Sequence, residues 1–295
     1  MNEFKTYHPI VNLVYFALVI GFSCFFMHPV CLGISLVCAF AYSAMQKGGS
    51  LAKRSLIYIL PMLGIMALLN PVFNHKGATI LGYLPSGNPL TMESIIYGFA
   101  AAVMLISIIC WFSCFSEVMT SDKIVYLFGR VLPSVSLVFS MTLRFVPKFT
   151  AQLKAIVNVQ KCLGRDMTGG SIVKRAKCGL SALSAATTWA LENAVDTADS
   201  MKSRGYGLSG RTAFSIFRFD SRDKALFIAV MLLGIYVLFG SLNGVVHFSY
   251  FPYLSGAEPS LYGLSVFAAY TALCLCPVII ELWEVRRWKI TESKM

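Results

Sequence analysis

Residues 171–207 read SIVKRAKCGLSALSAATTWALENAVDTADSMKSRGYG, and this stretch determines how the rest of the chain is interpreted. Its apolar residues recur mostly three or four positions apart, the spacing that places side chains on one face of a helix. Alanine and serine are frequent, which favours helix and lets another backbone approach closely. The pattern predicts one long helix. Its apolar stripe consists of Ile172, Ala176, Leu180, Leu183, Ala190, Ala194, Ala198 and Met201.

The end of this helix carries a clear stop signal. Gly205 suits the left-handed backbone conformation that closes a helix, and Arg204 stands where the last carbonyl groups favour a cation. A second amphipathic helix is predicted from about residue 134 to 163, and Gly164-Arg165-Asp166 follows it. Two helices of about thirty residues, each roughly 45 Å long, are therefore expected to finish in an arginine beside a glycine.

The composition indicates a membrane protein. Of the 295 residues, 57% are hydrophobic and only 13% are charged, whereas about a quarter is usual in soluble domains. Several apolar runs are long enough to cross a bilayer of roughly 30 Å. The net charge of +11 does not indicate a nucleic-acid partner, because cytoplasmic flanks of membrane proteins are rich in Lys and Arg. We expect an all-α polytopic protein in the cell membrane.

The apolar runs divide the chain into three parts. Membrane segments are predicted over residues 1–115, a cytoplasmic region of long amphipathic helices over 116–223, and further membrane segments with a cytoplasmic tail over 224–295. With both termini in the cytoplasm, every Lys and Arg except Lys76 falls on the cytoplasmic side. About six membrane-embedded segments are expected, at 10–46 (a pair broken at His28-Pro29), 55–70, 93–115, 224–243 and 262–282.

The motifs of the middle region resemble a known family. They are Arg144-Phe145-Val146-Pro147, Gln160, Gly164-Arg165-Asp166, Ser203-Arg204-Gly205-Tyr206 and Arg211-Thr212. Their order and spacing resemble the transmembrane T component of energy-coupling factor (ECF) transporters, in which two Ala-Arg-Gly motifs end two long cytoplasmic coupling helices. This chain departs from that pattern, since its motifs read Gly-Arg-Asp and Ser-Arg-Gly, but both central arginines remain.

The resemblance implies a coupling subunit of an ABC-type importer in a prokaryotic cell membrane, not an enzyme, and no cofactor. Two cytoplasmic ATPases would each receive one helix tip. The residues of the tips would be Gly164, Arg165 and Asp166, and Ser203, Arg204 and Gly205. A separate small membrane protein would bind a vitamin or a metal ion and lie on the coupling helices, where we expect contacts with Leu143, Ala182 and Ala185. Asp166 is expected to offset part of the charge of Arg165.

Other chemistry receives little support from the sequence. No GxxxxGK[ST] loop occurs, so the chain is not expected to hydrolyse ATP itself. Glu192, Asp196 and Asp199 share a helix face, but we expect them to pair with cations rather than to form a metal or acid–base site. The nine cysteines include no CxxC pair and are expected to be packing residues. No catalytic or metal site is predicted.

Two alternative functions stay open. One is a polytopic membrane enzyme with its active site in the region 116–223, and the other is a permease that binds its cargo directly. The apolar segments carry no charge deep inside them, which argues against an ion-translocating secondary transporter.

Overall fold

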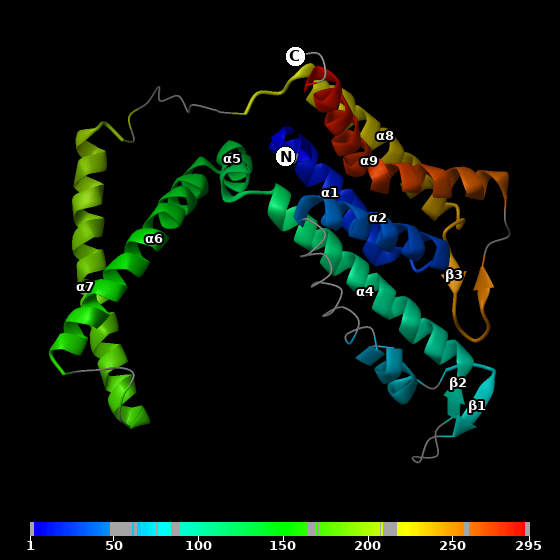
Figure 1. The fold of residues 1–295 in the computed structure, drawn as a ribbon, viewed down its shortest axis with the longest axis horizontal. Coiled ribbons are helices and arrows are strands. Elements are labelled where there is room, and N and C mark those ends of the chain that lie inside the picture. The colour runs from blue at the N-terminus through cyan, green and yellow to red at the C-terminus, as the bar shows by residue number, and fades with distance from the viewer. Residues whose placement is uncertain are drawn as a thin grey trace. The chain divides into compact units, whose positions relative to one another are not determined.

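The computed structural model describes residues 3–47, 61, 64–65, 67–74, 76–83, 89–164, 169, 171–206, 208, 217–256 and 260–292. Most of these residues are helical (Figure 1). The helices are η1 (Glu3–Thr6), α1 (Pro9–Phe25), α2 (Pro29–Lys47), α4 (Met92–Val118), α5 (Ser121–Val131), α6 (Pro133–Cys162), α7 (Ile172–Ser203), α8 (Ser221–Leu242) and α9 (Leu261–Glu292). Two short antiparallel hairpins complete the described elements, β1 (Ile80–Tyr83) with β2 (Pro89–Thr91), and β3 (Phe248–Ser249) with β4 (Ser255–Gly256).

The chain forms two compact units. The first consists of Met1–Ile124 and Phe217–Met295, and the second of Val125–Ile216. The predicted boundaries at residues 116 and 223, together with the assignment of the parts to membrane and cytoplasm, stay predictions.

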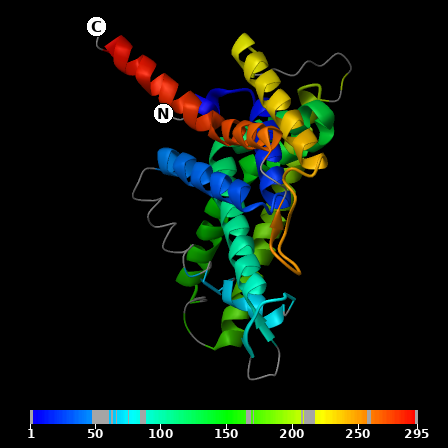
Figure 2. The same ribbon diagram turned by 90° about the vertical axis from the view of Figure 1, so that its right-hand side faces the viewer.

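Apolar helices build the first unit. α2 packs against α4 and α9, α1 packs against α4 and α8, and α8 packs against α9, as Figures 1 and 2 both show. Aromatic side chains fill the centre, and Trp111 is completely buried there. Its indole Nε1 donates a 3.0 Å hydrogen bond to Ser35 Oγ, and Ser35 in turn lies 2.8 Å from Ser23 Oγ. A buried indole N–H needs such a partner, so this polar pair fixes α1, α2 and α4 against one another.

Four helices of the described chain are long and apolar enough to cross a membrane: Pro29–Gln46, Met92–Val118, Ser221–Leu242 and Leu261–Arg287. α1 is apolar but has only 17 residues. These helices confirm the predicted class, an all-α polytopic membrane protein. They also confirm the predicted break before Pro29, which occupies the first turn of α2, where the missing N–H of proline costs nothing.

The third predicted segment, 55–70, lies largely outside the described residues. Its described part is helical but does not end at Asn70-Pro71 as expected, because residues 71–73 continue the helix. Gly98 of α4 lets this helix lie close to α4. A Cβ on Gly98 would lie 2.9 Å from Asn70 Cβ and 3.0 Å from the carbonyl oxygen of Ala67, so only glycine permits this close packing.

One acidic side chain at the edge of the last predicted apolar segment is buried. Glu281 of α9 is only 5% exposed, near the end of the last predicted segment. Its Oε1 and the hydroxyl of Tyr42 are buried without a hydrogen-bond partner among the described residues. The helix α9 extends well beyond residue 282 and keeps this side chain inside the helix bundle.

Candidate functional site

Helices α6 and α7 of the second unit form an antiparallel pair. Gln160 Nε2 donates a 3.2 Å hydrogen bond to Ser181 Oγ, and Lys148 Nζ donates a 2.9 Å hydrogen bond to Asn193 Oδ1. The two bonds pair residue 148 with 193 and residue 160 with 181. Their positions are twelve residues apart on each helix and run in opposite directions along the chain. The end of α7 therefore lies near the start of α6. The two glycine-terminated helix ends consequently lie at opposite ends of the pair.

Small residues of α7 make the close contact between the helices. The buried residues of α7 are Cys178, Ala182 and Ala186, spaced by four, and such a row of small side chains lets a second helix approach closely. Phe149 and Trp189 add an edge-to-face contact at 5.4 Å between ring centroids. Lys148 Nζ lies 5.3 Å from the centroid of the same Trp189 ring, which adds a cation–π contact.

This packing separates the three residues predicted to contact a membrane partner. Ala182 is only 2% exposed and packs between the two helices, so in this arrangement it is not accessible to a membrane partner. Leu143 is half-buried and Ala185 is exposed. Ala182 and Ala185 are three residues apart and chemically identical, and their different burial follows from where α6 crosses α7.

The central part of the predicted apolar stripe of α7 is exposed, whereas Met201 at its end lines the pocket beside α6. Its members Leu180 and Leu183 are 66% and 59% exposed, and Leu191 and Val195 extend the same face at 64% and 62%. The opposite face, with Cys178, Ala182 and Ala186, packs on α6. Contiguous exposed apolar side chains of this size mark a surface that meets a partner or lipid.

The end of α7 has the backbone of a Schellman motif. Gly205 adopts the left-handed conformation with φ 74°, which confirms the prediction for this glycine. Its N–H donates to the carbonyl of Lys202 at 3.0 Å, and the N–H of Tyr206 donates to the carbonyl of Met201 at 3.1 Å. These are the two bonds that satisfy the last carbonyl groups of a helix. Arg204 is the capping residue of α7, with its side chain exposed.

The end of α6 also has a left-handed glycine, but here the glycine stands before the arginine of the motif. Gly164 has φ 72°, and its N–H donates to the carbonyl of Lys161 at 3.1 Å. The left-handed glycine thus precedes Arg165 but follows Arg204, so the two arginine motifs are not equivalent in their relation to the helix end. Arg165 and Asp166 themselves lie outside the described residues.

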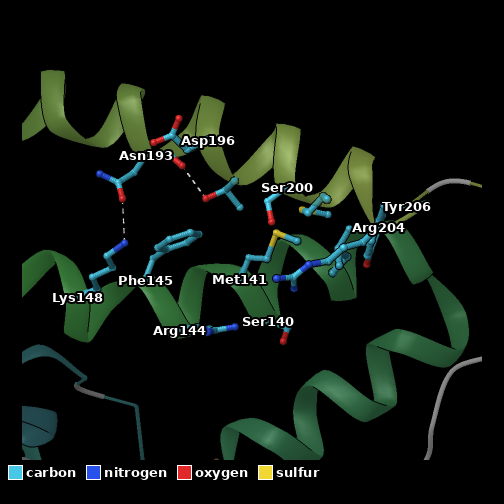
Figure 3. A pocket seen from close by; sticks show the side chains of 14 residues that line it. Ser140, Met141, Arg144, Phe145, Lys148, Asn193, Asp196, Ser200, Arg204 and Tyr206 are labelled. Atoms are coloured by element: carbon cyan, nitrogen blue, oxygen red, sulfur yellow. Dashed lines mark hydrogen bonds between the residues drawn. The ribbon is translucent and has the colours of Figure 1, made fainter.

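A pocket of about 890 Å³ lies between the first half of α6 and the last turns of α7 (Figure 3). Its charged lining consists of three cations, Arg144, Lys148 and Arg204, and one acid, Asp196. Figure 3 shows Arg204 reaching from the end of α7 toward Met141 of α6. The pocket is therefore a mainly cationic groove that contains one of the two predicted tip arginines.

Sequence reasoning did not assign Lys148, Asn193 or Tyr206 to this site. These residues come together only through the antiparallel register of α6 and α7, which places residues 137–148 opposite residues 193–204. Of the predicted acidic row, Asp196 lines the pocket, whereas Glu192 and Asp199 are exposed outside it. No group of three His, Cys, Asp or Glu side chains is gathered within the described ranges as a metal site would require.

The two terminating glycines permit a matched test of the helix ends. Gly205→Ala should lower the thermal stability of the second unit, because a left-handed alanine costs about 1–2 kcal/mol and its Cβ would lie 3.0 Å from Leu208 Cδ1. Gly164→Ala has the same backbone strain, but no atom of the described residues lies within 4 Å of the new Cβ, so its loss of stability should be smaller. Thermal unfolding of the purified variants measures both. Equal melting temperatures for wild type and Gly205→Ala would contradict the assigned cap.

Comparison with known proteins connects this architecture to a family. The family model CbiQ, described as Cobalt transport protein, matches residues 5–215. Energy-coupling factor transporter transmembrane protein EcfT of Lactobacillus helveticus is 33% identical over 115 residues, 38% of this chain and 42% of that protein. The protein of the same name from Lactococcus lactis is 32% identical over 108 residues, 36% of this chain and 41% of its own length.

A longer alignment comes from the EcfT protein of Thermosediminibacter oceani, which is 29% identical over 215 residues, 69% of this chain and 77% of that protein. The chain spans only about two fifths of the length of the Lactobacillus and Lactococcus relatives. The family model, however, matches well over half of the chain, including both helices of the pair. The chain therefore belongs to the CbiQ family of cobalt transport proteins, the family of the transmembrane T component of energy-coupling factor transporters.

Proposed function

We propose that the protein is the coupling subunit of an ECF-type importer, which transmits the motion of two ABC ATPases to a separate substrate-binding membrane protein. The observation that carries this proposal is the antiparallel helix pair α6–α7, which has a glycine-terminated end beside an arginine at each of its two opposite ends. Membership of the CbiQ family supports the transport context.

The geometry of the pair suits two ATPases rather than one. A helix of 30 residues, such as α6, is about 45 Å long. One small groove cannot receive two tips that far apart, so each tip requires a docking site of its own. Arg204 would enter a groove on one ATPase and Arg165 a groove on the other, with a planar guanidinium group at each contact.

The exposed apolar face of α7 suits the substrate-binding partner. Leu180, Leu183, Leu191 and Val195 form a surface without charged side chains, and Ala185 lies exposed on the same helix. Such a surface holds a partner by apolar contact but permits it to slide and to be released, whereas ion pairs would fix one position. The partner would carry the cargo, a vitamin or a metal ion, and the coupling subunit itself would bind none.

The proposed cycle is a rigid-body transition. ATP binding closes the two ATPases, the tips move with them, and the helix pair tilts as one body. The partner on the apolar face then reorients in the membrane and releases its cargo inward. Neither alternative function, membrane enzyme or cargo-binding permease, gains a specific supporting feature among the described residues.

Reconstituted transport tests the proposal. Proteoliposomes are prepared with two ATPases and a substrate-binding membrane protein encoded near this chain, with or without the chain, and ATP-driven uptake of the radiolabelled cargo is measured. Uptake should require both ATP and this chain. Uptake without the chain, or by the chain alone without the ATPases, would rule out a coupling role.

The proposed orientation has its own test. Ser171, at the start of α7, is exposed and should lie in the cytoplasm. In a cysteine-free background, Ser171→Cys should react with a membrane-impermeant maleimide only after the cells are opened. A cysteine at Lys76, which is exposed and predicted to lie outside, serves as the positive control. Labelling of residue 171 in intact cells would place this residue outside the cell and contradict the proposed topology.

A further inference from the structure

The N-terminal segment, residues 3–8, reaches the place where the chain leaves the first unit. That unit ends at Ile124 before the helix pair begins. Lys123, one residue earlier, is only 4% exposed, and its Nζ donates a 2.6 Å hydrogen bond to the backbone carbonyl of Lys5. The residues that lead out of the first unit are therefore tied to the N-terminal segment by a partly buried, charge-assisted hydrogen bond.

The same segment also holds the place where the chain returns. The first unit resumes at residue 217, and Asp223 in the first turn of α8 is 6% exposed. Its Oδ1 accepts a 3.1 Å hydrogen bond from the backbone N–H of His8, and its Oδ2 accepts another at 3.1 Å from Asp220, which closes the capping box of α8. The His8 ring also lies edge-on to Phe219, with 4.8 Å between centroids.

The N-terminal segment is itself anchored in the core. Phe4 is completely buried and contacts the rings of Tyr15, Phe16 and Tyr42, at centroid distances of 5.2, 6.1 and 6.2 Å. Edge-to-face aromatic contacts of this kind stabilise a segment beyond the burial of its surface. The segment is thus fixed at Phe4 while its backbone holds Lys123 on one side and Asp223 on the other.

Buried charges at both connections are costly and call for an explanation. Burial, and then the charge of Lys5, lowers the pKa of Lys123 to about 8, whereas Asp223 opposes that change and favours the charged form. Apolar side chains in place of buried charged groups are often as stable or more stable, so charges kept in such a position favour one defined geometry. Here the geometry in question is that of the two places where the chain leaves the first unit, near Lys123, and returns to it, near Asp223.

We propose that the N-terminal segment clamps both connections to the helix pair, and that Lys123 and Asp223 are positioning residues for energy coupling. The inference rests on the proposed function, since a tilting helix pair transmits force only when its two attachment points are fixed. If those points were loose, the ATP-driven tilt would be absorbed by the connections and would not reach the substrate-binding partner.

Two variants and one control test the clamp. Lys123→Met removes the donor but keeps an unbranched side chain, and Asp223→Asn replaces one of the two carboxylate oxygens that accept from the backbone N–H groups of His8 and Asp220. Lys224→Met, at an exposed neighbouring position, makes the same charge change as the first without touching the segment. Hydrogen exchange of residues 4–12 is measured on the purified chain in nanodiscs. Cargo transported per ATP hydrolysed is measured on the complex with two ATPases and the substrate-binding protein.

Both clamp variants should raise exchange in residues 4–12 by about tenfold, because a hydrogen bond to a charged group is lost. Transport per ATP should fall roughly threefold to tenfold with the ATPases still bound, and Lys224→Met should resemble wild type. Unchanged exchange would overturn the clamp, and raised exchange with normal transport per ATP would overturn its role in coupling. If Lys123→Met does not assemble, Asp223→Asn decides the same question. If wild type binds no ATPase, the proposed function fails, while the exchange data still test the clamp.

Discussion

Simultaneous replacement of Arg165 and Arg204 by alanine is expected to abolish ATP-driven uptake while the protein still inserts into the membrane. The candidate spans found among the described residues include neither arginine, so we expect insertion not to depend on them. Truncating a buried, hydrogen-bonded charge at an interface typically costs about 2–5 kcal/mol, partly because its partners are left unpaired. Losing both tips removes the connection to both ATPases.

The single variants should rank the two tips. Arg204→Ala is expected to reduce ATPase co-purification and uptake strongly, because Arg204 caps α7 and its side chain is exposed. Arg165→Ala should have a smaller effect, because we expect the neighbouring Asp166 to offset part of its charge. Arg204→Lys should also impair coupling, because it keeps the charge but loses the planar fork of donors.

Lys202→Ala is the matched control for the arginine variants. Lys202 is exposed in the last turn of α7, so its loss changes the net charge by the same amount as Arg204→Ala and at nearly the same place. Uptake and ATPase co-purification are measured on the same preparations. Normal uptake by the double arginine variant, or an equal loss with Lys202→Ala, would remove the specific role of the tips.

Substitution of Ala182 by phenylalanine is expected to have the second large effect, and the same substitution at Ala185 is expected to have a different one. Ala182→Phe should disrupt the helix pair, because Ala182 is 2% exposed against α6, and overpacking a tight contact costs typically about 1–3 kcal/mol. Its melting temperature, ATPase binding and uptake should all fall. Ala185→Phe places the same ring on an exposed position of the same helix and should leave folding and ATPase binding intact.

Ala185→Phe should nevertheless lower uptake and retention of the substrate-binding protein, because a large ring would disturb the surface proposed for that partner. Thermal unfolding, co-purification of the ATPases and co-purification of the substrate-binding protein separate the two variants. If Ala185→Phe retains full uptake, Ala185 is not part of the surface that contacts the partner.

Local signals in the sequence predicted the helices and their ends. α6 and α7 begin and end within a residue or two of the predicted positions, because Gly164 and Gly205 are stop signals that act through backbone conformation alone. The apolar runs predicted the membrane helices for the same reason, since length and composition are properties of each segment by itself.

Properties that depend on a second segment could not be predicted. α7 has a leucine-rich stripe and a row of small residues on its other side, and both are compatible with helix packing. Only contact with α6 decides that the small residues Cys178, Ala182 and Ala186 are buried and the central part of the stripe is exposed. The burial of Glu281 likewise depends on other helices, and the two hydrogen bonds of the N-terminal segment join residues far apart in the chain.

Site-specific photo-cross-linking at the two helix tips tests the central claim most directly. A photoreactive amino acid is introduced at position 165 or 204, or at both, in the complex with the two ATPases, and the products are identified by mass spectrometry. A third variant with the probe at Lys76 is the control. The coupling model predicts that each tip cross-links to an ATPase, that the double variant captures two ATPase subunits per chain, and that Lys76 captures none. Capture of a single ATPase by both tips, or no capture at either, would contradict the model.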